Sequence, residues 1–305
     1  MKKEGQEATK YCGIIPPLLT PLQADETLDE ESFEKIIEYC IKNGVSGLFT
    51  MGTTGEAVNV SRKVWKQASK FAISTVKGRV PVFSGVIDSS TARVIENIKE
   101  LEDSGASIVV VSPFFYLQNT CQDEIIRHYE QICRATDLKV VVYNIPSTTH
   151  ANILPETMLE LSKIDNIVAY KDSCADFEQF QRNLFLMKDA SVSILNGAEE
   201  LCAASMLFGA DGCIPGLANL FPRVFVSMYE ATLKRDLDRA FELQKQVWEI
   251  RKILFAGKSW LSGMKYAAQR LHLCSEKATS PIEPLQFEEK KKIERIIDQY
   301  CSSFI

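Results

Sequence analysis

The sequence predicts a (β/α)8 TIM barrel followed by a helical C-terminal region. A strand-then-helix unit recurs about eight times along the chain. The strand segments are continuous apolar runs, which is typical of a parallel sheet covered by helices on both faces. From about Arg235 onward only helix-period segments follow. We therefore expect a closed barrel, with a short N-terminal tail, in residues 1–234 and a helical region in residues 235–305.

The expected strands alternate with amphipathic helices that carry recognisable start and stop signals. Before the first helix, Asp29 is a suitable N-cap residue, and Gly44 marks its end. Pro155 lies where a first helical turn accepts proline. The buried face of the first helix is expected to contain Phe33, Ile36, Ile37 and Cys40. The apolar strand segments begin at Gly13, Val45, Val80, Ser107, Lys139, Asn166, Ser191 and Ala210.

Length and composition narrow the function classes. A barrel of this type occupies about 200–250 residues as one domain, so 305 residues are enough for one barrel and a helical extension. The net charge of −5 does not favour nucleic acid or an anionic membrane as a partner. No apolar run has the length of a membrane span, and residues 1–10 lack the apolar stretch of a signal peptide. We expect those residues to form a solvated tail.

Cysteine and histidine usage gives no sign of a metal site or a disulfide framework. The nine cysteines are scattered, odd in number and contain no CxxC pair. The three histidines lie far apart and have no metal-ligand spacing. This pattern favours reduced, mostly buried thiols in a cytoplasmic protein without a bound metal.

Polar side chains gather at the expected C-terminal ends of the strands, where barrels of this type place their chemistry. Lys171 is the most unusual, because it ends the apolar run IVAYKDS and a buried ammonium is costly. Strand alternation puts Lys171 on the same face as Ala169, and Tyr143 on the same face as Val141, so that in register both could project from adjacent strands into one pocket. The residues at this rim are Thr53, Thr54, Glu56, Tyr143, Lys171, Asp172, Ser173, Glu199 and Glu200.

Each of these residues also has an ordinary structural explanation. A lysine at a strand end can extend to solvent, and Tyr143 can fill the core with its hydroxyl satisfied. The GTTGE segment can be a simple tight turn, since it lacks the lysine of a phosphate-binding loop. The acids of residues 198–200 can merely favour a helix N-terminus. Their joint occurrence at one rim is what favours a functional site.

Four motifs together resemble the dihydrodipicolinate synthase/N-acetylneuraminate lyase family. They are GTTGE (52–56), YNIP (143–146), the lysine of YKDS (170–173) and FGADGCIPGLAN (208–219), in the family's order. The resemblance implies a pyruvate-dependent aldolase in which Lys171 attacks a 2-oxo acid and forms a Schiff base, an electron sink for the adjacent C–C bond. It implies that Tyr143 is the general acid/base, and since position 115 is Phe, either Thr53 with Tyr143 or a substrate hydroxyl would have to manage the proton. The amine must be neutral to attack, which would explain its apolar surroundings.

The resemblance also implies the binding residues and the assembly. Hydroxyls and backbone N–H groups of Thr53 and Thr54 would hold the pyruvate carboxylate, and the main chain near Ile214 would close that site. It implies no metal or organic cofactor, and a homotetramer made of two tight dimers. Residues expected to contact the distal part of the substrate are Ser173, Gly197, Glu199 and Glu200.

Several positions depart from the family pattern. The tyrosine that synthases lend across the dimer interface is Phe115 here, and Tyr116 next to it is expected to point elsewhere. The arginine that binds the second substrate's carboxylate is Thr148, which cannot form a bidentate pair. A loop glycine is His150, which either faces inward or lies on the surface. The serine expected in the lyase branch is Gly216.

These departures favour one function and leave two alternatives. The favoured hypothesis is a lyase that cleaves, or forms, a 2-oxo acid with a hydroxylated tail, such as a 2-keto-3-deoxy sugar acid or a sialic-acid-like compound. Its products would be pyruvate and an aldehyde. The first alternative is 4-hydroxy-tetrahydrodipicolinate (dihydrodipicolinate) synthase, which condenses pyruvate with aspartate semialdehyde. Phe115 and Thr148 count against it. The second alternative is a homologue that binds a 2-oxo acid without turnover.

Overall fold

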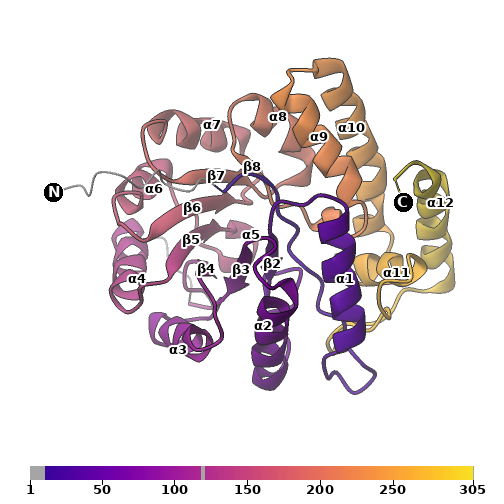
Figure 1. Cartoon of the computed structure of the whole chain (residues 1–305), viewed down its shortest axis with the longest axis horizontal. Coiled ribbons are helices and arrows are strands. Elements are labelled where there is room, and N and C mark those ends of the chain that lie inside the picture. The colour runs from indigo at the N-terminus through magenta and orange to yellow at the C-terminus, as the bar shows by residue number, and fades with distance from the viewer. Residues whose placement is uncertain (1–10, 118–120, 305) are drawn as a thin grey trace.

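The computed structural model describes residues 11–117 and 121–304, with side chains described up to residue 300. The solvated tail expected for residues 1–10 lies outside the described residues. Eight parallel strands form one sheet in the order β1-β8-β7-β6-β5-β4-β3-β2 (Figure 1). The strands are β1 (Gly13–Ile14), β2 (Leu48–Thr50), β3 (Val82–Gly85), β4 (Ile108–Val111), β5 (Lys139–Asn144), β6 (Ile167–Asp172), β7 (Ser193–Asn196) and β8 (Gly212–Cys213).

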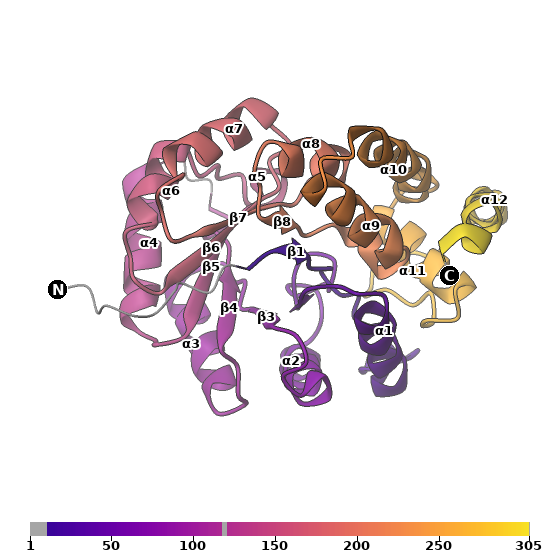
Figure 2. The ribbon, with the colours of Figure 1, turned by 45° about the horizontal axis from the view of Figure 1, so that its top comes forward.

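The two ends of this sheet meet, so the sheet closes into a barrel. A parallel bridge joins Pro17 to Phe49, and the N–H of Phe49 donates to the carbonyl of Pro16 at 3.0 Å. β1 is much shorter than the apolar run that begins at Gly13, because Pro16 and Pro17 have no N–H for a regular ladder. Figure 2 shows the helices around the strands. The predicted (β/α)8 barrel with a C-terminal helical extension is confirmed.

Five of the described helices begin after a residue whose side chain caps the first turn, namely Asp29, Ser61, Ser90, Asp176 and Asp236. Asp29 accepts a hydrogen bond from the N–H of Ser32 at 3.1 Å, and α1 ends before Gly44, whose φ is +84°. α6 begins at Pro155, as expected. The helices up to residue 233 are α1 (Glu30–Lys42), α2 (Arg62–Val76), α3 (Thr91–Glu102), α4 (Gln122–Arg134), α5 (Pro146–Thr149), α6 (Pro155–Leu161), α7 (Phe177–Leu186), α8 (Cys202–Leu207) and α9 (Pro222–Leu233). Short 3-10 helices cover η1 (Glu199–Leu201) and η2 (Gly216–Asn219).

Two apolar cores follow from strand alternation. On β5, Val141 and Tyr143 face the interior of the barrel, whereas Val140 and Val142 pack outward against the helices. Tyr11 lies in the interior core, with its ring in edge contact with Phe83. The interior is therefore a packed cylinder, and a functional site has room only at its rim.

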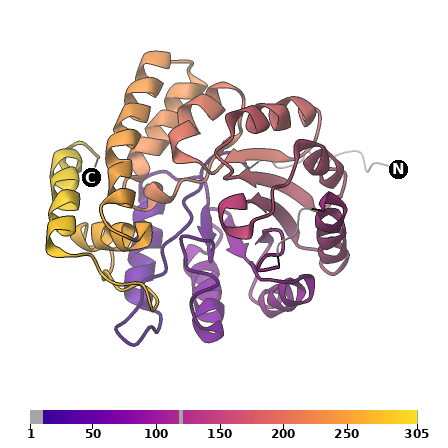
Figure 3. The same ribbon diagram turned by 180° about the vertical axis from the view of Figure 1, so that it is seen from behind.

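The chain after α9 is helical. It forms α10 (Leu237–Ile250), the 3-10 helix η3 (Arg251–Phe255), α11 (Trp260–Arg270) and α12 (Phe287–Phe304). α10 packs against α9, and α11 packs against η3 and α12. Figure 3 shows this region on one side of the barrel, beside α1 and far from α3, α4 and α6. None of the described helices combines the length and apolar character needed to cross a membrane.

Candidate active site

Lys171 and Tyr143 meet inside the barrel, as strand alternation predicts. They are direct partners in the parallel register of β5 and β6. Both are almost fully buried, with 3% and 2% of their surface exposed. The Lys171 Nζ lies 4.0 Å from the centroid of the Tyr143 ring and 5.1 Å from that of Phe49. The amine is thus surrounded by aromatic faces, and no carboxylate among the described residues pairs with it.

Thr53 lies next to this pair. Its Oγ1 is 3.4 Å from the Tyr143 hydroxyl, so the two can exchange a proton through one hydrogen bond. Thr53 belongs to the turn that follows β2, and this turn includes left-handed backbone at Met51 and Glu56, with φ of +54° and +58°. A β-carbon at Gly85 would lie 1.9 Å from the carbonyl oxygen of Met51. The turn is therefore pressed directly against β3.

Gly197 and Ser173 complete the surroundings of the amine. A β-carbon at position 197 would lie 2.0 Å from the Ser173 Oγ and 2.9 Å from the Lys171 Cε. Both residues follow the ends of neighbouring strands, since β6 ends at Asp172 and β7 at Asn196. The sequence placed Ser173 at this rim and Gly197 only through the resemblance, and the structure brings Gly197 close to both Ser173 and Lys171.

Ile214 and Glu199 lie at the end of β8 and in η1. The N–H of Ile214 donates to the Asn196 carbonyl at 2.8 Å. The Glu199 Oε1 accepts from the N–H of Leu217 at 2.8 Å, and burial raises the pKa of this carboxyl. A β-carbon at Gly216 would lie 3.2 Å from the Glu199 Oε1 and 3.6 Å from the Thr54 Oγ1. Glu199 and Thr54 therefore flank the same small space.

Glu200 has a different environment from Glu199. Its Oε1 forms an ion pair with Arg251 of η3 at 2.9 Å, and both side chains are partly exposed. The Arg251 guanidinium also lies over the rings of Trp248 and Phe255. The two neighbouring acids are thus held by different parts of the chain, and contact of Glu200 with a substrate stays a prediction.

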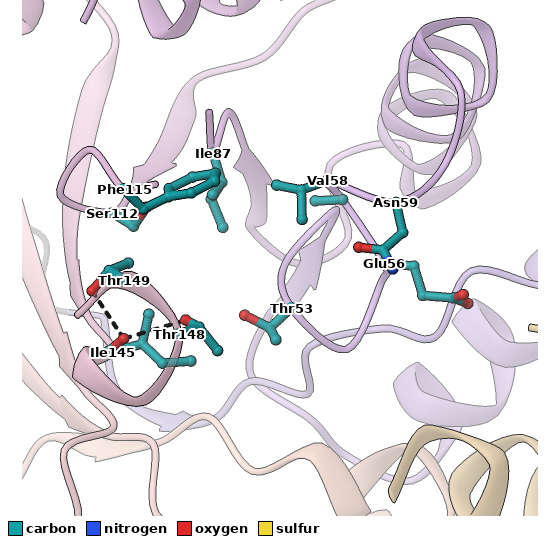
Figure 4. Close-up of a pocket in the computed structure, with 11 residues that line it drawn as sticks. Thr53, Glu56, Val58, Asn59, Ile87, Ser112, Phe115, Ile145, Thr148 and Thr149 are labelled. Carbon is teal, nitrogen blue, oxygen red and sulfur yellow. Dashed lines mark hydrogen bonds between the residues drawn. The ribbon is translucent and has the colours of Figure 1, made fainter. Parts of the chain in front are cut away.

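A pocket of about 200 Å³ opens beside Thr53 (Figure 4). Thr53 borders it from the β2 side, and Thr148 borders it from α5. Glu56 is the single charged residue among those that line it, and its carboxylate already contacts Lys265 and Thr279. The pocket therefore offers hydroxyls and apolar surface but no cation. Its lining residues are Thr53, Glu56, Ala57, Val58, Asn59, Ile87, Ser112, Phe115, Ile145, Thr148 and Thr149.

The positions that depart from the family pattern are distributed between this pocket and the surface. The ring of Phe115 lines the pocket, whereas Tyr116 is 90% exposed. The Thr148 Oγ1 donates to the carbonyl of Ile145 at 3.3 Å. His150 is the C-cap residue of α5, has left-handed backbone and is exposed. Of the two expected placements of this histidine, facing inward or lying on the surface, the structure shows the second.

The ends of β5 and β6 are also tied together outside the barrel, which the sequence analysis did not foresee. The Asp172 Oδ1 accepts from the Asn144 side chain at 3.1 Å and from the N–H of Cys174 at 3.0 Å. Burial raises the pKa of Asp172. These bonds fix the strand ends that carry Tyr143 and Lys171. Among the described residues, no three His, Cys, Asp or Glu side chains are grouped so that they could hold a metal ion.

Comparisons with known proteins identify the family of this chain. The model of the dihydrodipicolinate synthetase family matches residues 10–300. A 4-hydroxy-tetrahydrodipicolinate synthase of Desulfotalea psychrophila is 35% identical over 82% of this chain and 83% of its own length. A synthase of the same name from Phenylobacterium zucineum is 33% identical over 90% of this chain and 92% of its own length.

Solved structures agree as well. A dihydrodipicolinate synthase from Bacteroides thetaiotaomicron superposes with a TM-score of 0.90 at 35% identity, covering 95% of this chain and 98% of that one. A prophage protein of the dihydrodipicolinic acid synthase family from E. coli K12, solved with pyruvate, gives a TM-score of 0.90 at 27% identity, with coverages of 95% and 98%. The predicted resemblance, and with it the prediction of an enzyme, is confirmed. The chain belongs to the dihydrodipicolinate synthetase family.

Proposed function

We propose that this protein is a pyruvate lyase or aldolase that works through a Schiff base on Lys171. The observation that supports this most strongly is the buried amine of Lys171, 4.0 Å from the centre of the Tyr143 ring. In the proposed reaction the neutral amine attacks the ketone carbon, water leaves, and the iminium accepts the electron pair of the adjacent C–C bond. No external cofactor is needed, because the lysine supplies the electron sink.

Tyr143 and Thr53 are proposed to move the protons of this reaction. Their 3.4 Å separation allows the phenol to give a proton to the substrate oxygen and to take one back through the threonine hydroxyl. Thr53 and Thr54, with the main chain at Ile214, are proposed to hold the pyruvate carboxylate. The distal part of the substrate would contact Ser173, Gly197, Glu199, Glu200 and Thr148.

The pocket beside Thr53 supports a particular kind of aldehyde partner. Its polar groups are the hydroxyls of Thr53, Ser112, Thr148 and Thr149 and the amide of Asn59. Such groups suit an uncharged, hydroxylated tail, as in a 2-keto-3-deoxy sugar acid or a sialic-acid-like compound. A carboxylate placed here would lose hydration without gaining a cation as partner, so the pocket favours an uncharged tail over a charged one.

A second candidate is 4-hydroxy-tetrahydrodipicolinate synthase, which condenses pyruvate with aspartate semialdehyde. The names of the relatives from Desulfotalea psychrophila and Phenylobacterium zucineum favour it over the lyase reading. The pocket disfavours it, because Thr148 and Phe115 supply neither a guanidinium nor a phenol. A third possibility, binding of a 2-oxo acid without turnover, would show as adduct formation without any aldol reaction.

One screen distinguishes these candidates. The protein is incubated with pyruvate and one aldehyde in each of three separate reactions. The aldehydes are a polyhydroxylated aldehyde, a short neutral aldehyde and aspartate semialdehyde, and the condensation product is followed by mass spectrometry. We expect condensation with the hydroxylated aldehyde, and none by the Lys171→Met variant. Condensation with aspartate semialdehyde alone would assign the synthase activity and contradict our proposal.

The assembly and location are also proposals. We infer a cytoplasmic homotetramer of two tight dimers that binds a small 2-oxo acid, with no nucleic-acid or membrane partner. The family resemblance supports this assembly, although one solved structure similar to this chain is a monomeric dihydrodipicolinate synthase variant. Sedimentation velocity at micromolar concentration measures the state directly, and a monomer would contradict the inference.

A further inference from the structure

Lys265 is a buried cation that the proposed reaction does not use. It lies on α11, in the C-terminal helical region, and none of its surface is exposed. Its Nζ forms an ion pair with the Glu56 Oε1 at 2.9 Å and donates to the carbonyls of Thr20 and, at 3.0 Å, Lys277. A wholly buried ammonium is tolerated only with such complete pairing. The lysine therefore has a defined set of partners, and one of them belongs to the GTTGE turn.

Glu56 is also held by the C-terminal region, through both of its carboxylate oxygens, and Oε2 forms the hydrogen bonds. Its Oε2 accepts hydrogen bonds from the N–H of Thr279 at 2.8 Å and from the Thr279 hydroxyl at 2.7 Å. Lys265 and Thr279 both lie after the last strand of the barrel, more than 200 positions from Glu56 in the chain. The last residue of the GTTGE turn is thus fixed by the C-terminal region rather than by its own strand.

A second contact holds the same turn from the barrel side. The Thr20 hydroxyl donates to the carbonyl of Gly55 at 2.7 Å, while the Thr20 carbonyl accepts from Lys265. The turn needs such support, because Glu56 has left-handed backbone, which costs free energy for a residue with a β-carbon. Thr53, which meets the Tyr143 hydroxyl, is only three residues away within the turn.

We propose that Lys265 and Glu56 form a positioning pair through which the C-terminal helical region holds the Thr53 hydroxyl against Tyr143. The pair carries no proton of the reaction, and although Glu56 lines the pocket, its carboxylate is engaged by Lys265 and Thr279. Its role is to keep a strained turn in the one arrangement that completes the Thr53–Tyr143 contact. This inference rests on the proposed function, because it assigns the pair an effect on proton transfer at the Lys171 site.

Replacing a buried ion pair with apolar residues of the same volume often leaves a protein equally stable or more stable. Stability alone therefore does not explain the presence of this pair. The partners of Lys265 come from three separate segments, around Thr20, Glu56 and Lys277. The hydrogen bonds to the carbonyls of Thr20 and Lys277, with the ion pair to Glu56, define a geometry that apolar packing would leave less specific. The pair therefore fixes the position of the turn in addition to keeping the turn buried.

The test is a mutant cycle with a readout for proton transfer. The exchange of pyruvate methyl protons for deuterium is followed by NMR, and the Lys171 adduct is measured after borohydride reduction. We expect Lys265→Met to lower the exchange rate by about tenfold to a hundredfold, as expected when catalytic groups are misplaced by about 1 Å. The yield of adduct at saturating pyruvate should be unchanged.

The decisive comparison uses the Thr53→Val background. If the pair acts through the Thr53 hydroxyl, adding Lys265→Met to Thr53→Val should change the exchange rate by less than about twofold, a clear failure of additivity. An equal loss in both backgrounds would overturn the proposal and leave a general structural role. Unchanged exchange in Lys265→Met itself would overturn it as well.

Two milder variants and a matched control complete the design. Thr20→Val and Thr279→Val each remove one hydroxyl contact of the turn without burying an unpaired charge, so they replace Lys265→Met in the cycle if that variant does not fold. The control is Lys290→Met, because the Lys290 Nζ pairs with Glu276 at 2.6 Å, a pair within the C-terminal region that includes no residue of the turn. Its exchange rate should equal that of the wild type. Absence of any pyruvate adduct in the wild type would overturn the proposed function itself. If the wild type forms the adduct but Lys265→Met lowers the exchange rate equally in the wild-type and Thr53→Val backgrounds, only the role of the pair is overturned.

Discussion

Replacing Gly197 with alanine places a methyl group in the space beside the Lys171 side chain. The new β-carbon would lie 2.0 Å from the Ser173 Oγ, 2.9 Å from the Lys171 Cε and 3.1 Å from the carbonyl oxygen of Asp172. The serine hydroxyl can rotate away. The carbonyl cannot, because Gly197 donates its own N–H to that oxygen at 2.7 Å. The lysine side chain must therefore move.

The size of the effect follows from this geometry. One extra methyl in a well-packed interior typically costs about 1–3 kcal/mol of folding free energy. A displacement of a reacting group by about 1 Å can cost on the order of a hundredfold in rate. We therefore expect Gly197→Ala to remain folded but to form the Lys171 adduct with pyruvate about a hundredfold more slowly.

The assay is the rate of adduct formation, measured by quenching with borohydride and weighing the intact protein, with urea unfolding as the control for stability. A Ser173→Ala/Gly197→Ala double variant removes the 2.0 Å contact and keeps the contact with Lys171. It should recover stability and remain slow. A wild-type rate in Gly197→Ala would refute the reasoning, because it would show that the amine does not need its present position.

Other predictions follow from the same geometry. Tyr143→Phe removes the hydroxyl that lies 3.4 Å from Thr53, so the adduct should form but pyruvate methyl exchange should fall by about 10²–10⁴-fold; undiminished exchange by NMR would contradict the acid/base role. Thr148→Arg alone should not create synthase activity in a coupled reductase assay, because Phe115 still supplies no phenol; robust condensation would show that the missing tyrosine is unimportant. His128 lies on the buried face of α4, where its ring contacts the Thr91 hydroxyl and the carbonyl of Ser112, and burial lowers its pKa to about 4 from 6.5. The unfolded chain therefore binds a proton near pH 6.5 that the folded chain does not bind until about pH 4, and stability should fall by up to about 3 kcal/mol as the pH drops through that window. In His128→Gln this part of the pH dependence of urea unfolding should disappear, and its persistence would contradict the assignment.

The fold was predictable because its signals are local. Continuous apolar strands, the Asp29 cap and the proline at the start of α6 each act within a few residues. Alternation on β5 and β6 was enough to predict that Tyr143 and Lys171 could project into one pocket, and the two are register partners. The shortening of β1 also has a local cause in Pro16 and Pro17, although the apolar run that begins at Gly13 concealed it.

The contacts that the sequence did not predict join residues far apart in the chain. Lys265 and Glu56 pair through the packing of α11 against the barrel, and nothing in the local pattern of either segment indicates its partner. The same is true of Phe49, which reads as an ordinary strand residue but faces the Lys171 amine. Glu199 and Glu200 are neighbours in sequence, yet one contacts the N–H of Leu217 and the other Arg251. Such pairings depend on how elements dock.

The central claim is that the buried amine of Lys171 forms a covalent adduct with pyruvate. The most direct measurement is to incubate the protein with pyruvate and borohydride, weigh the intact chain and map the modified peptide. We predict one adduct per chain, located on Lys171 and absent from Lys171→Met. Absence of an adduct, or an adduct on another lysine, would contradict the account.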